Sequence, residues 1–341
     1  MTEATNIILN PNGNHRRDGR QWIAGQRVCL RELAPAEVTL VESVEEAALA
    51  AKQSALKGYQ KIVSVGDSAT AHGVVNGVMG LAEGHRKRLK VGFLSFSRPD
   101  LWSRTLELPR NLARQLEILS AGHTMPFDVG QVDCYDDSGN RIVRYFLNGA
   151  SFGVTGRITR EWHNPESTLF QSLPSILAAL SDAVSSDGQR VRLESMGASI
   201  YEGKCALGMI MGGRYYHALG RIAPQADPTD GRLELAWLRP ESLWGVIPRF
   251  AGSWLPPFRG SAPFHWHSLE QVRAISLDGP VYLDLDGQPT GRLPAAFSVL
   301  RRALPVMVAP VAVKLKKPRF APVNKLGNRR LVGNIKSAAG M

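Results

Sequence analysis

The sequence predicts an α/β domain followed by an antiparallel, sandwich-like β domain, and two patterns support this. Up to about residue 127, apolar strand patterns alternate with helical patterns, which is typical of a parallel sheet covered by helices. Beyond that point, short β-rich runs separated by turn sequences dominate, as they do in antiparallel sheets. We therefore assign residues 1–127 to the first domain, 128–312 to the second, and 313–341 to a basic tail.

The first domain begins with a short strand over Asn6–Leu9, which ends where the following Asn-Pro pair forces a turn. A helix is expected over Ser43–Lys57, because Ser43 and Glu46 form a capping box ahead of an alanine-rich apolar face. The remaining elements are expected in the order strand, helix, strand, helix: 61–65, a helix ending at 78, 88–93 and 101–119.

The second domain is expected to contain mainly strands, with turns such as Asp137–Asn140 and Asp286-Gly287 between them. One helix is expected over 172–183, with Pro174 tolerated in its first turn. The predicted strands span 129–135, 141–148, 206–211, 233–238, 272–276, 281–285 and 306–313.

The charge of the chain is concentrated at its C-terminal end. The net charge is +11, and no acidic residue occurs from Val311 to Met341. The basic residues of this tail are Lys314, Lys316, Lys317, Arg319, Lys325, Arg329, Arg330 and Lys336. Such a segment suits an anionic phosphate surface, either nucleic acid or lipid headgroups; the alternative is a solvated tail that keeps the protein soluble.

Composition excludes several other classes. The chain contains no uninterrupted apolar window of about 18 residues, so a membrane-spanning helix is not expected. The N-terminus lacks the pattern of a signal peptide. The three cysteines show no CxxC spacing, which fits a reducing compartment rather than a disulfide frame or a zinc site. We therefore expect a cytoplasmic protein.

A small-residue turn, Gly66–Thr70, follows the predicted strand 61–65 and opens a helix. Backbone N–H groups at such a turn can approach phosphate oxygens closely, and the helix dipole favours the negative charge. On its own the turn is a weak signal, because ordinary strand-to-helix turns also contain Gly and Asp.

Further motifs accompany this turn in a fixed order: Ile8-Leu9-Asn10-Pro11, Val74-Val75-Asn76-Gly77, Phe146–Gly153, Gly212–Tyr216, Ile222–Gly231, Asp286-Gly287-Gln288 and Pro305–Pro310. In this order and spacing the chain resembles the diacylglycerol kinase catalytic family, which includes bacterial diacylglycerol kinases, sphingosine kinases and ceramide kinases. The resemblance covers roughly residues 6 to 311. It implies a nucleotide-binding α/β first domain, a lipid-binding β-sandwich second domain and an active site in the cleft between them.

The resemblance also implies a reaction, the transfer of a phosphoryl group from ATP to a lipid hydroxyl with Mg²⁺. It makes Asp286 the base that takes the hydroxyl proton; the alternative is a plain Asp-Gly hairpin turn. It places a metal at Asp227 and Asp230, where the alternative is an Asx turn. The residues expected to hold ATP are Asn10, Gly66, Asp67, Ser68 and Thr70.

The nucleotide motifs depart from the family pattern. The family's Gly-Gly-Asp-Gly-Thr loop is followed by a glutamate, and without gaps Gly73 stands at the position of that glutamate. A one-residue insertion would instead place Asp67 on the family aspartate, and both registers remain open. The family's second nucleotide motif, Gly-Thr-x-Asn-Asp, is replaced by Ser97–Leu101, in which Arg98 is a candidate phosphate ligand. In a third motif, Gln288 stands where the family has glutamate.

Two hypotheses follow. The first is a lipid kinase that associates peripherally with the inner face of an anionic membrane and phosphorylates diacylglycerol or a ceramide-type lipid. The second is an inactive lipid-binding or regulatory protein on the same fold, which the altered loop favours. Nucleic acid is not expected as a partner, because the tail lacks interleaved aromatic residues; a homodimer is a candidate assembly. The pair His265 and His267 is expected to serve strand packing rather than a metal.

Overall fold

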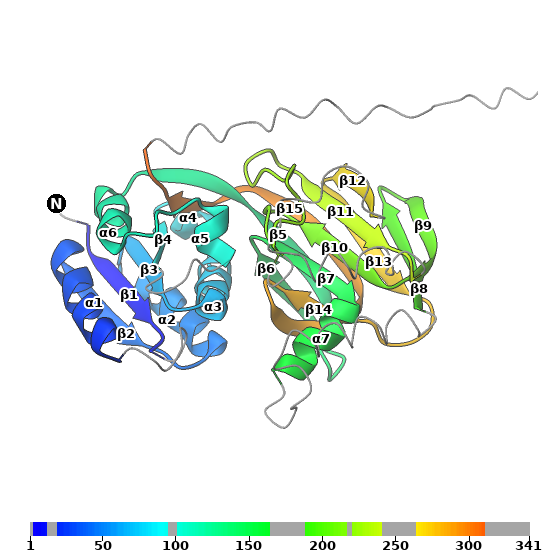
Figure 1. The fold of residues 1–341 in the computed structure, drawn as a ribbon, viewed down its shortest axis with the longest axis horizontal. Coiled ribbons are helices and arrows are strands. Elements are labelled where there is room, and N and C mark those ends of the chain that lie inside the picture. The colour runs from blue at the N-terminus through cyan, green and yellow to red at the C-terminus, as the bar shows by residue number, and fades with distance from the viewer. Residues whose placement is uncertain are drawn as a thin grey trace, which may run out of the picture.

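The structure is a computed structural model that describes residues 3–11, 19–94, 101–163, 188–216, 220–240 and 264–310. Two lobes lie side by side in Figure 1, an α/β domain and a β-rich domain. Within the described residues, no helix is both long enough and apolar enough to cross a membrane. The elements of the α/β domain are β1 Thr5–Leu9, α1 Gly19–Glu32, β2 Ala36–Leu40, α2 Val44–Leu56, β3 Lys61–Val65, α3 Ser68–Met79, α4 Glu83–Arg86, β4 Lys90–Leu94, α5 Leu101–Thr105 and α6 Leu112–Ala121.

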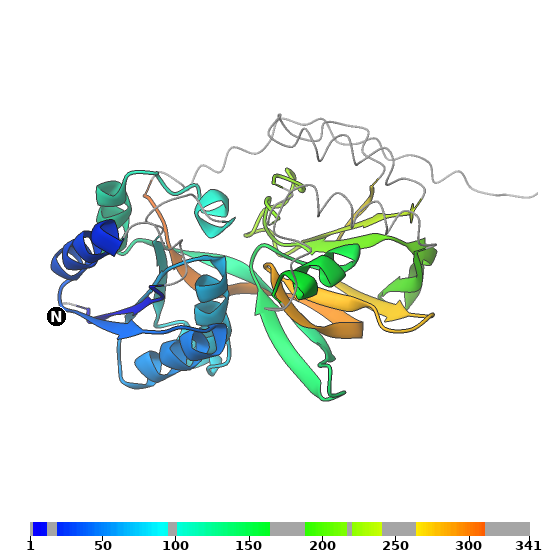
Figure 2. The ribbon, with the colours of Figure 1, turned by 60° about the horizontal axis from the view of Figure 1, so that its bottom comes forward.

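The four strands of this domain are parallel and lie in the order β2-β1-β3-β4. Neighbouring residues of one strand face opposite sides of the sheet: Ile8 packs in a core with α2 and α3, whereas Ile7 packs in a core with α1 and α6. Figure 2 shows these helices on the two faces of the sheet. Because the chain continues from β1 to β2 on one side and later returns to β3 on the other, the strand order reverses between β1 and β3. In open α/β sheets, ligands bind outside the carboxyl ends of the strands at such a point.

The β-rich domain consists of two antiparallel layers that share the long strand β15. One layer contains β12, β11, β10, β7 and β14, and the other contains β9, β8, β13, β5 and β6. Residues of both layers, such as Phe152 and Val132, form one apolar core between them. The elements are β5 Thr124–Tyr135, β6 Arg141–Phe146, β7 Gly149–Gly153, α7 Val154–Trp162, β8 Gln189–Ser195, β9 Ala198–Cys205, β10 Leu207–Met211, β11 Leu233–Leu238, β12 His265–Leu269, β13 Gln271–Ser276, β14 Tyr282–Leu285 and β15 Gln288–Met307.

Two strands connect the lobes. β5 leaves the α/β domain and continues into the β-rich domain, and β15 returns antiparallel to it over most of its length. The end of β15 then pairs with β4 in parallel, at Val306 and Val91. The sequence boundary near residue 127 therefore falls inside β5.

The α/β and antiparallel β architecture that the sequence predicts is confirmed, and several elements differ in detail. The single helix predicted over 101–119 is wrong: α5 and α6 are separated by a segment that contains Pro109, and Asn111 caps α6. The predicted strands 281–285 and 306–313 correspond to β14 and to the end of β15. The predicted helix 172–183, residues 311–313 and the tail 313–341 lie outside the described residues.

Candidate functional site

The candidate phosphate turn lies at the carboxyl ends of β1 and β3, where the strand order reverses. The backbone N–H of Asn10, just after β1, donates to the carbonyl of Val65 at the end of β3, at 2.9 Å. Gly66 follows, and a Cβ atom there would lie 2.7 Å from Thr70 Oγ1 and 3.3 Å from the Cβ of Asn10. Glycine is therefore required for the turn to close on α3, and Asn10 and Gly66 lie side by side.

Asp67 caps the N-terminus of α3. Its Oδ1 accepts hydrogen bonds from the backbone N–H and the hydroxyl of Thr70, both at 2.9 Å. The amides of Ser68 and Ala69 belong to the first turn, where N–H groups have no intrahelical acceptor. These amides and the positive end of the helix dipole fit a phosphate group. Asp67 and Thr70 thus shape the turn, and Ser68 begins the helix.

Asp286 is fully buried and held by backbone amides. Its Oδ1 accepts from the N–H groups of Asn148 and Gly149 at 2.9 and 3.0 Å, and its Oδ2 accepts from the N–H of Leu147 at 3.1 Å. Its own backbone N–H donates to the carbonyl of Gly149, and its φ of 52° lies in the left-handed region. The carboxylate therefore lies under a turn of the β-rich domain, with three donors fixed on it.

A side chain of the α/β domain reaches this carboxylate. Nδ1 of His72, on α3, lies 3.5 Å from Oδ2 of Asp286, and the exposed fraction of His72 is 4%. His72 comes two residues after Thr70, so along the helix axis it is only about 3 Å beyond the phosphate turn at about 1.5 Å per residue. One helix thus connects the candidate phosphate turn to the candidate base.

The two domains meet around the same helix. Asn76 of α3 bonds twice to Tyr145 of β6: its Nδ2 donates to the carbonyl at 3.0 Å and its Oδ1 accepts from the N–H at 2.9 Å. Thr105 of the α/β domain also bonds to the side chain of Asn148. The domains are therefore joined by directed hydrogen bonds beside Asp286.

Residues 5–132 match the model of a family described as "Diacylglycerol kinase catalytic domain". A diacylglycerol kinase of Staphylococcus aureus (strain JH9) is 23% identical over 350 aligned positions, which cover 98% of this chain and 97% of that protein. The resemblance to the diacylglycerol kinase family is confirmed.

Solved structures agree on the fold of this family. A diacylglycerol kinase from Bacillus anthracis str. Sterne superposes with a TM-score of 0.68 at 18% identity, covering 91% of this chain and 98% of that chain. A yeast NADH kinase solved in complex with NADH superposes with a TM-score of 0.50 at 11% identity, covering 90% of this chain and 83% of that one. At these identities the likeness shows the shared two-domain fold.

Gly73, which stands where the diacylglycerol kinase family has glutamate in the ungapped register, faces α2 and not the phosphate turn. A Cβ atom there would overlap the carbonyl of Val44 and lie 2.8 Å from the Cβ of Ala47. No larger side chain fits between the two helices at this position. His72, one residue earlier, is the side chain that faces Asp286.

Asp227 and Asp230 lie in a turn whose carboxylates bond to nearby backbone. Oδ1 of Asp227 accepts from the N–H and hydroxyl of Thr229 at 3.0 and 2.7 Å, and Oδ1 of Asp230 accepts from the N–H of Arg232 at 2.9 Å. These are the bonds of Asx turns. Partial burial raises the pKa of Asp230, and nearby carboxylates, including Asp227, raise it further.

The donor set of this turn fits a magnesium ion that keeps most of its water. The described hydrogen bonds use the Oδ1 atom of each carboxylate, and Mg²⁺ is often held by only one or two carboxylates. Within the described ranges, no group of three or more His, Cys, Asp or Glu residues could hold a metal ion. An ion here would also offset the repulsion between the carboxylates.

Two other sequence predictions concern residues away from the phosphate turn, Asp286 and the carboxylates Asp227 and Asp230. Arg98 lies outside the described residues. His265 and His267 stack on Trp237, and their ring centroids lie 5.1 and 5.3 Å from that of Trp237, so they pack across neighbouring strands.

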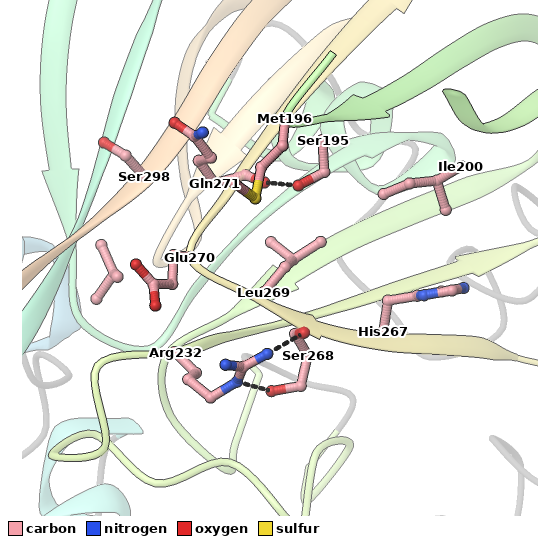
Figure 3. Close-up of a pocket in the computed structure, with 11 residues that line it drawn as sticks. Ser195, Met196, Ile200, Arg232, His267, Ser268, Leu269, Glu270, Gln271 and Ser298 are labelled. Atoms are coloured by element: carbon pink, nitrogen blue, oxygen red, sulfur yellow. Dashed lines mark hydrogen bonds between the residues drawn. The ribbon is translucent and has the colours of Figure 1, made fainter. Parts of the chain in front are cut away.

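A surface pocket of about 590 Å³ lies beside His267 and Met196 (Figure 3). None of the candidate nucleotide, metal or base residues lines that pocket.

The sequence interpretation did not single out His72 or Asn148 as site residues. Asn148 is fully buried, and its Nδ2 has no hydrogen-bond partner among the residues that the structure describes. A signal for His72 was present: it lies four residues before Asn76, on one face of the helix that follows the phosphate turn. No signal in the sequence pairs it with Asp286, which is 214 residues away.

Proposed function

We propose that this protein is an ATP-dependent lipid kinase that phosphorylates the hydroxyl group of a lipid alcohol. One observation carries the proposal: α3 starts at the candidate phosphate turn and contacts Asp286 through His72. A nucleotide held at the turn would place its terminal phosphate near the carboxylate. The confirmed family resemblance supports the same reaction class.

In the proposed site, each group has a distinct role. Asn10, Gly66, Asp67, Ser68 and Thr70 form the turn that holds the phosphates, with Arg98 as a further candidate ligand. Asp286 is the base that takes the proton of the acceptor hydroxyl. Mg²⁺, when bound, would neutralise phosphate charge, and Asp227 and Asp230 are the candidate residues for a metal that stabilises the site.

The acceptor is a lipid alcohol of the diacylglycerol or ceramide type. The named relatives are diacylglycerol kinases, which favours diacylglycerol as the first compound to test. An anionic membrane surface is the expected place of encounter, because the lipid resides there and the acid-free tail is basic.

The direct experiment measures transfer of labelled phosphate from ATP to a panel of lipid alcohols in mixed micelles, with wild-type protein and Asp286→Asn. We expect a lipid product from the wild type and a loss of roughly 10²–10⁴-fold in the variant. Asp284→Asn is a poor control, because Asp284 is itself buried and bonded to Ser151 and Thr159. Asp278→Asn, at an exposed turn, is the better one and should retain activity.

A second candidate function is lipid binding or regulation without catalysis. The altered phosphate loop and Gln288, which stands where the family has glutamate, favour it. The two functions are separated by calorimetry with ATP, with and without Mg²⁺. Lipid binding without nucleotide binding would establish the second function and exclude the first.

A further inference from the structure

The proposed function, on which this inference rests, needs the turn that carries Asp286 to be held in a fixed position. Asp286 and Gly287 form the turn between β14 and β15, and their φ values are 52° and 84°. Both residues are buried, so the N–H groups of this turn need partners within the protein. The N–H of Asp286 donates to the carbonyl of Gly149 at 2.8 Å.

Asp284, two residues earlier on β14, holds the other amide of this turn. Its Oδ1 accepts from the N–H of Gly287 at 3.2 Å. Asp284 is buried, and its neighbours Leu283 and Leu285 face the apolar core between the two layers. Because side chains alternate along a strand, the Asp284 carboxylate lies on the opposite face of β14, against which α7 packs (Figure 1). A carboxylate buried in this way needs several hydrogen-bond donors.

Three side chains from different parts of the β-rich domain supply those donors. The hydroxyls of Ser151 on β7 and Thr159 on α7 donate to Oδ2 of Asp284, at 2.7 and 3.1 Å. The hydroxyl of Tyr216, which follows β10 and is buried, donates to Oδ1. Burial raises the pKa of Tyr216 well above its usual value, and the charge of Asp284 raises it further. The Tyr216 hydroxyl therefore keeps its proton and remains a donor.

The bond between Ser151 and Asp284 also ties the turn to an amide that binds Asp286. Ser151 and Asp284 are paired in the antiparallel register of β7 and β14. β7 begins at Gly149, whose N–H donates to the Asp286 carboxylate at 3.0 Å. Asp286 is thus two residues from Asp284, and its donor Gly149 is two residues from Ser151. The Ser151–Asp284 bond therefore holds the carboxylate of Asp286 in place relative to this donor.

Tyr216 reaches the same backbone from β10. The N–H groups of Gly212-Gly213, just after β10, donate to the carbonyl of Asn148 at 2.9 and 2.8 Å. The N–H of Asn148 in turn donates to Asp286 at 2.9 Å. The segment 212–216 therefore contacts the surroundings of Asp286 at Asn148 and, through the Tyr216 hydroxyl, at Asp284. Loss of that hydroxyl would remove the second of these contacts.

We propose that Asp284 is a positioning residue of the kinase, which together with Tyr216 and Ser151 holds the turn that presents Asp286 to the acceptor hydroxyl. Buried polar networks whose members are all hydrogen-bonded make a region rigid and favour one conformation. Stability alone does not require a carboxylate here, because replacing buried charged groups by well-packed apolar ones is often neutral or stabilising. Asp284 therefore acts on the reaction through the position of Asp286.

The test measures kcat and KM for lipid phosphorylation by the full chain as wild type, Tyr216→Phe, Asp284→Asn and Asp284→Leu. Tyr216→Phe keeps the ring and should lower kcat by roughly 10–10²-fold, because small misplacements of a reacting group cost that much, with KM for ATP and lipid unchanged. Asp284→Leu should lose at least as much. Asp284→Asn should lose less, because its amide oxygen still accepts from Gly287 and hydroxyls can donate or accept. Tyr201→Phe is the matched control: the Tyr201 hydroxyl bonds to the carbonyl of Lys204 on β9, and its loss should leave kcat unchanged.

A second readout does not depend on activity. In hydrogen–deuterium exchange followed by mass spectrometry, peptides covering 147–149 and 286–288 should exchange faster in Tyr216→Phe than in the wild type, whereas a peptide covering β3 should not change. Faster exchange in all peptides would indicate a loss of global stability and would overturn the positioning role. Unchanged exchange at 147–149 and 286–288 would overturn it as well.

The kinetic outcomes separate this proposal from the proposed function. Normal kcat in Tyr216→Phe, an effect confined to KM, or equal losses in Asp284→Asn and Asp284→Leu would overturn the positioning role and leave the kinase function intact. If Asp284→Leu does not fold, Tyr216→Phe decides, because it keeps the aromatic ring in its apolar surroundings. A wild type that phosphorylates no lipid alcohol overturns both proposals.

Discussion

Gly77 of α3 lies so close to Ala48 of α2 that a Cβ atom on Gly77 would overlap the Ala48 carbonyl group. One turn earlier, Gly73 has the same relation to Val44. The two glycines therefore form the face of α3 that packs directly against the backbone of the alanine-rich helix α2. This close packing fixes the direction of α3, and with it the positions of the phosphate turn and of His72.

Gly77→Ala and Gly73→Ala are expected to destabilise the protein, because neither backbone can move without unpacking the domain core. Overpacking of this kind typically costs about 1–3 kcal/mol, measured as the free energy of unfolding in urea. Gly84→Ala is the matched control: it lies in α4 with no atom within 4 Å of the added Cβ, and should be neutral or stabilise by up to about 1 kcal/mol. Equal effects at all three glycines would contradict the packing argument.

The same packing predicts the result of restoring the family residue. Gly73→Glu should unfold or severely destabilise the protein rather than improve nucleotide binding, since the side chain would enter the α2–α3 contact. Activity gained by Gly73→Glu would mean that this position faces the nucleotide.

The alternation of strands and helices in the α/β domain could be predicted from the sequence, because β1, β3 and β4 are short apolar runs and α2 has a capping box. Three elements of that domain escaped prediction, and one of them, α4, is a single turn of four residues. Helix α1 has no acidic residue in its first turn and contains Gly25, so its signals are weak. Strand β2 is an edge strand with half-exposed residues, so it lacks the apolar run that marks a buried strand.

The strand-to-helix turn Gly66–Thr70 could also be predicted, because its residues are consecutive; its role as a phosphate site stays a prediction. The pairing of His72 with Asp286 could not, since it depends on how β5 and β15 bring the second domain onto α3. Gly73 shows that a motif comparison can also assign the wrong role to a residue. A motif comparison reads it as a lost functional residue, whereas the structure gives it a packing function.

Asp67 and Ser68 can be separated by their effects on stability and on nucleotide binding. Asp67→Ala removes the N-cap of α3 and should cost about 0.5–2 kcal/mol of stability, whereas Asp67→Asn should keep most of the cap. Ser68→Ala should leave stability nearly unchanged. Calorimetry with ATP then shows which position contacts nucleotide: if Asp67→Asn binds ATP normally and Ser68→Ala does not, the ungapped register is correct. The reverse result supports the register with the insertion.

Asp230 should respond to both pH and Mg²⁺. Partial burial and then its carboxylate neighbours raise the pKa of Asp230 in the folded protein, so the fold disfavours its charge at neutral pH. Asp230→Asn should therefore raise Tm at pH 7 without metal, and this gain should vanish as pH falls below the usual aspartate range, near pH 3.9. Added Mg²⁺ should raise Tm of the wild type but not of Asp230→Asn. A wild type that does not respond to Mg²⁺ would remove the metal from this turn.

The basic tail after Val313 should strengthen binding to anionic membranes. Its residues lie outside the described part of the chain, and its eight basic side chains follow from the sequence alone. Each one that reaches the surface is worth about 1 kcal/mol, so truncation after Val313 should weaken binding to phosphatidylserine vesicles by at least tenfold if two of them do so. A full-length variant with these residues changed to Gln separates charge from chain length and should match the truncation. High salt should mimic both changes, because it screens the same attraction. Equal binding of the wild type to neutral and anionic vesicles would show that the tail does not act at the membrane, and the lipid would then have to be recognised by the folded domains alone.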